Sequence, residues 1–301
     1  YTAYLKVAEG CDNRCTYCAI PLIRGGFRSR PIEDLVKEAK ELESIGVKEL
    51  NLIAQDTTRY GLDLYGEYRL PELIRAICEA TAIPWIRILY CYPDKITEEL
   101  IAEVKNNDRI VKYIDLPIQH ISDRMLSAMN RHGDSAMIKA VVERLRREIP
   151  DICIRTTVIV GFPGETEEDF NELCEYIAQT EFDRLGAFTY SREEDTPAYD
   201  FENQIDEQTK QDRYDIIMRE QLHIAERKNQ AFVGKRMTVL CEAYDSVAEI
   251  YYGRSAYDAP DIDTKVYFRN ALGKKRIAPG AFVEVDIEEA VDYDLIGRAV
   301  V

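Results

Sequence analysis

Three cysteines near the start of the sequence have the type and spacing that could do chemistry. Cys11, Cys15 and Cys18 follow the pattern C-x-x-x-C-x-x-C directly after a short apolar segment. Three thiolates at this spacing can ligate three irons of a 4Fe–4S cluster and leave the fourth iron free for a small molecule. The pattern therefore predicts that these cysteines are the metal ligands of a catalytic centre.

A zinc site and a chance grouping remain open as alternatives for the three cysteines. A structural zinc ion takes four ligands, commonly cysteine pairs or cysteine with histidine, and the nearest histidine in the sequence is His120. A zinc ion held by three cysteines is rarer, and chance grouping of buried cysteines is the simplest alternative. The remaining cysteines are not grouped, which favours small buried side chains. They are Cys78, Cys91, Cys153, Cys174 and Cys241.

The segments that must position the cysteines alternate between strand and helix patterns over the first two thirds of the sequence. Strands are predicted at 3–8, 50–54, 85–90, 113–116, 152–160 and 185–190. Helices are predicted at 32–45, 70–82, 97–105, 122–130 and 135–148, then after the capping residue Thr166, and finally at 206–232. Six alternations predict an α/β fold with a parallel sheet, whose site lies at the carboxyl ends of the strands.

The pattern changes after the long helix. Short alternating stretches at 235–243, 251–256, 265–268, 281–290 and 295–301 are separated by Gly, Pro and Asp. Five short strands in this span predict a small antiparallel β-barrel. The sequence is therefore divided into a core with its connector helix at 1–230 and a second domain at 231–301.

Charge and hydrophobicity restrict the function classes. The chain of 301 residues has 39 basic and 55 acidic side chains, which gives a formal net charge of −16. It has no long apolar run and no secretory leader, so we expect a cytoplasmic protein without a membrane partner. Residues 231–301 carry 9 basic and 12 acidic side chains. This balance is a modest argument against a nucleic-acid partner and for a basic protein partner.

The stretch CDNRCTYCAIP, from Cys11 to Pro21, resembles the signature of radical S-adenosylmethionine (SAM) enzymes, in which an aromatic residue, here Tyr17, precedes the third cysteine. The resemblance continues through the segments IAQD at 53–56 and GFPGET at 161–166. The carboxyl-terminal barrel is similar to a TRAM domain. The match covers essentially the whole chain and is closest to the methylthiotransferases. It implies a partial (β/α)6 TIM-like barrel followed by a TRAM, OB-like barrel.

Within the methylthiotransferases, three segments resemble the RimO type, which modifies an aspartate of small-subunit ribosomal protein twelve. They are LYCYP at 89–93, LPIQH at 116–120 and RSAYDAPDID at 254–263. The tRNA-modifying type tends to have Ser-His-Pro and Val-Gln-Ser-Gly in the first two places. The alternatives are a tRNA adenosine methylthiotransferase, and a zinc-stabilised RNA-binding module without enzymatic activity.

The resemblance also implies cofactors. The cluster binds SAM, an electron donor reduces it, and a 5′-deoxyadenosyl radical abstracts hydrogen from the aspartate β-carbon, which then receives the methylthio group. Members of this family carry a second, auxiliary 4Fe–4S cluster on an amino-terminal domain. This sequence begins at Tyr1, ten residues before Cys11. We therefore expect a truncated form and an auxiliary cluster only in the full-length protein.

Further residues are candidates for binding SAM. Beside Tyr17, they are Gln55 and Gln119 at strand ends, Arg155 on a strand, and Gly161 and Gly164 in the GFPGET turn. Gln55, with Asp56, is a candidate for the amino group of SAM or a polar strand end. Arg155 is a candidate for its carboxylate or for a salt bridge. The glycines permit close backbone approach to the adenosine or form a tight turn. His120 is a site candidate or a hydrogen-bonded core residue.

Overall fold

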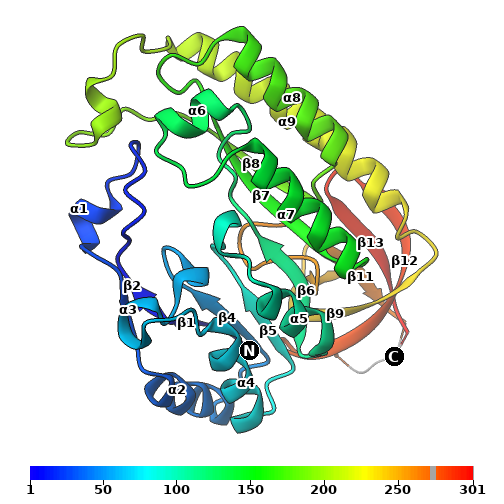
Figure 1. Ribbon diagram of the computed structural model, residues 1–301. Helices are drawn as coiled ribbons and strands as arrows, with labels where there is room; N and C mark the ends of the chain where they lie inside the picture. Colours follow the sequence, from blue (N-terminus) through cyan, green and yellow to red (C-terminus); the bar gives the residue numbers. More distant parts are fainter. Residues whose placement is uncertain (272–275, 301) are drawn as a thin grey trace.

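The computed structural model describes residues 1–271 and 276–300. Its larger part is an open sheet of six parallel strands in the order β1-β4-β5-β6-β7-β8, with helices along its outer face (Figure 1). The strands are β1 (Thr2–Lys6), β4 (Glu49–Ile53), β5 (Trp85–Ile88), β6 (Ile110–Asp115), β7 (Cys153–Val160) and β8 (Arg184–Thr189). This architecture confirms the expected partial (β/α)6 barrel.

The long helices follow the predicted segments closely, whereas two short helices, near residues 20 and 62, were not predicted. The long ones are α2 (Ile32–Ser44), α4 (Leu70–Ala80), α5 (Glu98–Asn106), α7 (Ser135–Glu148), α8 (Glu167–Thr180) and α9 (Glu207–Gln230). The short ones are α1 (Ile20–Arg24), α3 (Leu62–Tyr65) and α6 (Asp123–Ala128). Thr97 caps α5, and Thr166 forms a capping box with Asp169 at the start of α8, so both predicted helix starts are confirmed. Every helix among the described residues is too short or too polar to span a bilayer.

Side chains alternate between the two faces of the sheet. On β4, Leu50 and Leu52 belong to the main hydrophobic core, where helix residues such as Leu35 and Leu73 also lie. Glu49 and Asn51 alternate with the leucines, so they face the inner side of the sheet. At Glu49 and Asn51 the inner face of this strand is therefore polar although it is buried.

The first predicted strand is divided in two. Residues 3–8 were expected to form one strand, but β1 ends at Lys6, and β2 (Ala8–Glu9) leaves the sheet to pair antiparallel with β3 (Arg28–Ser29). The short ladder holds both ends of the loop that carries the cysteines. Gly10, at φ +80°, lies so close to Gly26 that a Cβ atom would be 2.1 Å from its carbonyl oxygen. Only glycine fits at the base of this loop.

The smaller part is a closed barrel with the strand order β10-β11-β13-β12-β9. Its strands are β9 (Arg236–Asp245), β10 (Ile250–Ser255), β11 (Val266–Asn270), β12 (Phe282–Val291) and β13 (Asp294–Ala299). Val301, the last residue of the predicted fifth strand, lies outside the described residues. The expected small antiparallel barrel is confirmed: neighbouring strands pair antiparallel except β11 and β13, which pair in parallel. A closed ring with an odd number of strands cannot alternate direction throughout, so one parallel pair is required.

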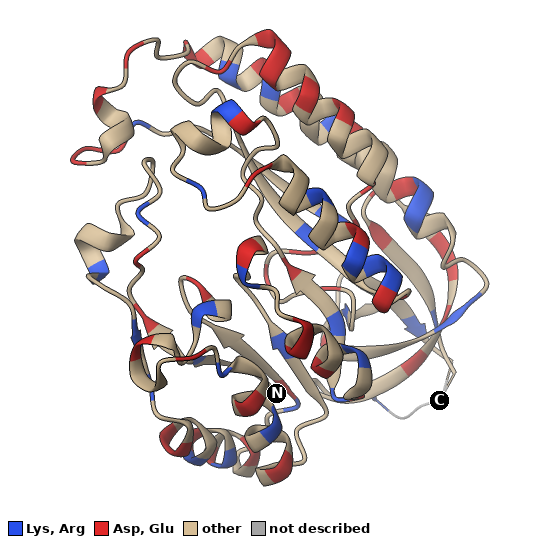
Figure 2. Cartoon of the chain, viewed as in Figure 1, with Lys and Arg blue, Asp and Glu red and all other residues tan. Residues whose placement is uncertain are grey.

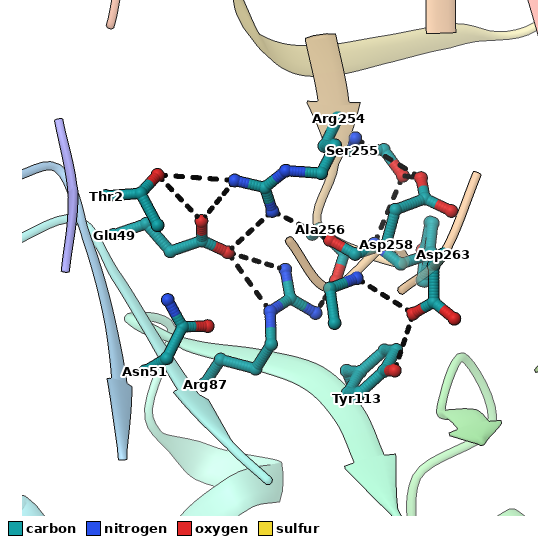
Figure 3. A network of polar contacts seen from close by, with 12 residues as sticks. Thr2, Glu49, Asn51, Arg87, Tyr113, Arg254, Ser255, Ala256, Asp258 and Asp263 are labelled. Atoms are coloured by element: carbon teal, nitrogen blue, oxygen red, sulfur yellow. Dashed lines mark hydrogen bonds and ion pairs between the residues drawn. The ribbon is translucent and has the colours of Figure 1, made fainter. Parts of the chain in front are cut away.

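A buried polar network joins the two parts (Figure 3). Glu49 accepts hydrogen bonds from Nε and Nη2 of Arg87 on β5, at 3.1 and 2.9 Å, and from Arg254 on β10, at 2.5 Å. Arg87 also donates to the carbonyl oxygen of Ala256 in the loop after β10. In the same loop Asp258 pairs with Arg184 at 2.7 Å. The barrel is therefore attached near the amino-terminal ends of the strands, opposite the end where the cysteines lie.

Replacing Glu49 by Gln should destabilise the protein strongly. The substitution leaves Arg87 and Arg254 buried without their shared carboxylate, and breaking a buried ion pair typically costs about 3–5 kcal/mol. Denaturant unfolding of both proteins would measure the difference in free energy. Glu288→Gln is the matched control, because Glu288 pairs with Arg298 at the surface, and such pairs contribute at most about 1 kcal/mol. Equal, small losses in both variants would contradict the assigned role.

Stability should also fall in acid because of Glu49. Burial acts to raise the pKa of Glu49, but the hydrogen bonds and charges of Arg254 and Arg87 outweigh it and hold the pKa below its ordinary value of 4.5. The contribution of this carboxylate is therefore complete above pH 4.5 and is lost as the pH falls through the lowered pKa of the folded state. Unfolding free energies measured from about pH 6 down to about pH 3 should decline less steeply in Glu49→Gln than in the wild type. Parallel pH profiles would count against this account.

Candidate functional site

The three cysteines lie on one cavity of about 410 Å³ at the carboxyl ends of the first strands. Lys6 at the end of β1, Gln55 beyond β4, and Tyr90 beyond β5 line the same cavity. All three thiols are free, and Cys11 and Cys15 are buried. The cysteine loop and the start of α1 form one side of the cavity, and the ends of three neighbouring strands form the other.

The loop that carries the cysteines is fixed by contacts with distant segments. The amide of Cys11 donates to the carbonyl oxygen of Gly25 at 3.1 Å, and the amide of Cys18 donates to that of Cys15 at 3.0 Å. Thr16 donates from its amide to the carbonyl oxygen of Met129 after α6, and its own carbonyl oxygen accepts from the amide of Ala198. The positions of the sulfur atoms therefore depend on several parts of the sheet edge.

Polar donors approach two of the sulfur atoms. Asn13 Nδ2 lies 3.4 Å from Cys11 Sγ. The hydroxyl of Tyr92 lies 3.3 Å from Cys15 Sγ, and Arg131 Nη1 lies 3.8 Å from the same sulfur. Donors to sulfur stabilise thiolates and are a regular feature around thiolate-bound metals. None of these three was predicted as a site residue, although Asn13 lies in the segment CDNRCTYCAIP and Tyr92 in LYCYP. Arg131 lies in no segment that the sequence pattern singled out.

Burial raises the pKa of the Cys11 and Cys18 thiols above their ordinary value, because water no longer solvates the thiolates. Without a metal, both cysteines are therefore held in the neutral form more strongly than exposed cysteines. A bound metal replaces the thiol proton, so binding at these sulfurs releases protons.

The arrangement fits a cluster better than a single ion. In the described part of the chain, no three His, Cys, Asp or Glu side chains come together in a way that could hold one metal ion. In a 4Fe–4S cluster each thiolate binds a different iron, so the sulfurs must line a cavity rather than meet at one point. Cys11, Cys15 and Cys18 do so. Gln55 Oε1, on the same cavity, is buried without a hydrogen-bond partner, which leaves one acceptor for a ligand.

Asp56 has a different position from its neighbour Gln55. Its carboxylate is fully buried, and Oδ2 accepts from Asn13 Nδ2 at 2.8 Å and lies 3.2 Å from Lys95 Nζ. Oδ1 accepts from the Thr58 hydroxyl at 2.8 Å. Asp56 therefore orients Asn13 beneath Cys11 and does not line the cavity.

Arg155 is paired with carboxylates away from the cysteines. Its guanidinium lies 3.0 Å from Asp115 and 3.4 Å from Asp263, which comes from the loop between β10 and β11. Asp115 in turn accepts from the backbone amide of Tyr90 at 2.9 Å. Tyr90 lines the cysteine cavity in a left-handed conformation, φ 60°, that is unusual for a bulky residue. Arg155 therefore reaches the cavity wall only through Asp115.

The structure does not bring the other candidates to the cavity wall. Tyr17 packs against an apolar cluster that includes Phe162 and Tyr190. Gln119 adopts φ 69° and forms an isolated parallel bridge with Val158. His120 is fully buried between Glu165, at 3.1 Å, and the amide of Ser122, at 3.0 Å.

The two candidate glycines lie against α9 and the segment that precedes it. Gly161, at φ 70°, lies under Lys210, whose Cγ would be 2.3 Å from an added Cβ. Gly164, at φ 80°, donates from its amide to the carbonyl oxygen of Asn203. Gly161 therefore permits the close approach of α9, whereas a Cβ added at Gly164 would meet only Arg124, at 3.8 Å.

Comparison with known proteins identifies both parts of the chain. Residues 5–177 match the Radical SAM superfamily, and residues 233–300 match the TRAM domain. The ribosomal protein uS12 methylthiotransferase RimO of Acetivibrio thermocellus is 52% identical over 99% of this chain, and that of Alkaliphilus oremlandii is 51% identical over 98%. The chain spans 65% and 67% of the lengths of these two relatives.

Solved structures agree on the fold of the larger part. The Escherichia coli coproporphyrinogen III oxidase, a radical SAM enzyme, has a TM-score of 0.53 at 18% identity and covers 76% of this chain and 58% of its own. The radical SAM methyltransferase TsrM of Kitasatospora setae, with tryptophan and a SAM analogue bound, has a TM-score of 0.54 at 17% identity, covering 81% of this chain and 42% of its own. At these identities the likeness concerns the fold alone. With the cysteine cavity at the strand ends and about half of all residues shared with RimO proteins, this chain belongs to the radical SAM superfamily and, within it, to the RimO family of methylthiotransferases.

Proposed function

We propose that this chain contains the radical SAM core and TRAM domain of an enzyme that attaches a methylthio group to the β-carbon of an aspartate in ribosomal protein uS12. One observation carries the proposal: three free cysteines line one cavity at the carboxyl ends of the strands, in a chain that shares about half of its residues with uS12 methylthiotransferases. A substrate that belongs to the ribosome places the reaction in the cytoplasm.

Within this proposal the cavity residues have distinct tasks. Cys11, Cys15 and Cys18 hold the 4Fe–4S cluster. Gln55 offers its unpartnered Oε1 to the amino group of SAM. When bound, the cluster and SAM supply a one-electron cleavage that yields a 5′-deoxyadenosyl radical for hydrogen abstraction. Cys11, Cys15 and Ala54 lie in the buried part of the cavity, whereas the exposed side chains of Lys6, Arg14 and Tyr90 border it.

The remaining predictions belong to the same proposal. The core comprises residues 1–230 and the TRAM domain residues 231–301. An auxiliary 4Fe–4S cluster is expected outside the residues of this chain, because the chain spans about two thirds of its relatives. A low-potential electron donor completes the reaction. Tyr17, Gln119, Arg155, Gly161 and Gly164 contribute through the packing around the cavity rather than from its wall.

Charge supports a protein substrate over tRNA. Acidic side chains are spread over α8, α9 and the barrel strands, with basic ones among them (Figure 2). On β12, Glu284, Asp286, Glu288 and Glu289 lie in one strand of the TRAM domain, where Arg236 pairs with Asp286 and Arg298 with Glu288. Acidic residues still outnumber basic ones in this domain, 12 to 9. A surface of this kind repels the phosphates of RNA and favours a basic protein such as a ribosomal protein.

The cluster assignment predicts that Cys15→Ala abolishes cluster binding and SAM cleavage. Loss of one thiolate leaves an iron without its ligand, because no other cysteine of the described residues lines the cavity. Iron content, visible absorbance and 5′-deoxyadenosine formation after anaerobic reconstitution would measure the loss. Cys78→Ala is the control, since Cys78 lies on α4, away from the cavity, and should retain all three. A colourless wild type that holds one zinc ion and cleaves no SAM would overturn the proposal.

The substrate assignment predicts tighter binding to uS12 than to tRNA. Binding of this chain to each partner at physiological salt should show the preference directly, because phosphate-driven binding weakens steeply as salt rises. In cells, mass spectrometry of uS12 should detect the methylthio group only where the gene for this protein is intact. Tighter binding to tRNA, with uS12 unmodified in both strains, would point to the tRNA-modifying type.

A further inference from the structure

Arg131 is exceptional among the buried basic side chains of the described residues. Each of the others forms an ion pair with a carboxylate within 4 Å. The pairs are Arg87 and Arg254 with Glu49, Lys95 with Asp56, Arg184 with Asp258, Lys210 with Glu207, and Arg213 with Glu165. Arg131 is only 8% exposed, yet its polar contacts in the described part of the chain include no carboxylate. A buried charge without a counter-ion is strongly unfavourable.

The contacts of Arg131 direct its charge toward one cysteine. Nη2 donates to the carbonyl oxygen of Pro117 at 2.7 Å, which fixes one side of the guanidinium. The guanidinium carbon lies 4.0 Å from the centre of the Tyr92 ring. Nη1 points to Cys15 Sγ at 3.8 Å, and the Tyr92 hydroxyl reaches the same sulfur at 3.3 Å. Both groups therefore converge on the Cys15 corner of the cavity.

Lys95 provides a useful contrast because it also lies against Tyr92, 4.5 Å from the ring centre. Its ammonium group is matched by Asp56 at 3.2 Å and Asp94 at 3.1 Å. The charge of Lys95 is therefore balanced within the protein, whereas that of Arg131 is balanced only when an anion occupies the cavity.

We propose that Arg131 is the counter-ion of the cluster at the Cys15 corner and, with Tyr92, makes the cluster easier to reduce; this inference rests on the proposed function. A cluster held by three thiolates is anionic, and it becomes more anionic when it accepts one electron from a low-potential donor such as a reduced flavoprotein. No bond forms or breaks in that step, and Arg131 keeps its proton throughout. A fixed positive charge stabilises the reduced form more than the oxidised form.

The test is an EPR-monitored redox titration of the anaerobically reconstituted chain, with dithionite as reductant. Arg131→Met should lower the cluster's equilibrium constant for reduction at least tenfold, which is a shift of about 59 mV for one electron. Arg131→Lys keeps the charge and should shift the potential less. Arg184→Met is the matched control, because Arg184 is equally buried, at 8% exposure, but pairs with Asp258 at the other end of the strands. It should leave the potential unchanged.

The metal-free protein gives a second, independent readout. If Arg131 has no counter-ion in the metal-free protein, Arg131→Met should unfold at the same or a higher denaturant concentration than the wild type, because the substitution removes an unpaired buried charge. Arg184→Met should unfold at a lower concentration, because Asp258 loses its partner. A purely structural role for Arg131 predicts a loss of stability in both variants.

The outcomes separate the two proposals. A wild type that takes up no cluster refutes the proposed function itself. A wild type with a cluster whose potential does not change in Arg131→Met, or an apo Arg131→Met that is markedly destabilised, overturns the counter-ion role alone. If Arg131→Met folds but binds no cluster, Arg131→Lys decides: cluster uptake by the lysine variant supports the need for charge, and its absence refutes it.

Discussion

Glu49, a carboxylate with no access to water, holds together two parts of the chain that are about 200 residues apart in sequence. Its oxygens accept from Arg87 on the sheet and from Arg254 on the barrel, so neither arginine is left with an unbalanced charge. Such a network is costly to assemble and costly to break, since each buried ion depends on the others. This constraint holds the TRAM domain at the end of the strands opposite the cysteine cavity.

The same requirement for charge balance organises the functional end of the sheet. Asp56 balances Lys95 and orients Asn13 toward Cys11. Asp115 balances Arg155 and holds the amide of Tyr90 on the cavity wall. Each carboxylate therefore stabilises a polar group that supports the cavity without lining it. The domain junction and the cavity lie at opposite ends of the parallel strands, and Arg155, which contacts both Asp115 and Asp263, lies between them.

Local patterns predicted most of the elements correctly, because their causes are local. Thr97 and Thr166 cap helices through bonds to amides three residues ahead, which the sequence shows directly. The alternation of apolar residues predicted the strands. It did not separate β1 from β2, because Ala8 leaves the sheet to pair with Ser29, a residue distant in sequence. The expected antiparallel barrel was confirmed, but the sequence did not show that β11 and β13 pair in parallel, since strand direction around a closed ring is a property of the whole ring.

The sequence by itself predicted the ligand set and determined the alternation of strand and helix and the family, because these depend on residue type and short spacing. Only the tertiary structure decided which polar residues reach the cavity. Gln55 and Asp56 are adjacent in sequence, yet one lines the cavity and the other lies beneath it. Arg131, without any local pattern to mark it, is brought to Cys15 from more than a hundred residues away. Burial and charge pairing act through space, and a single sequence does not show which distant groups will meet.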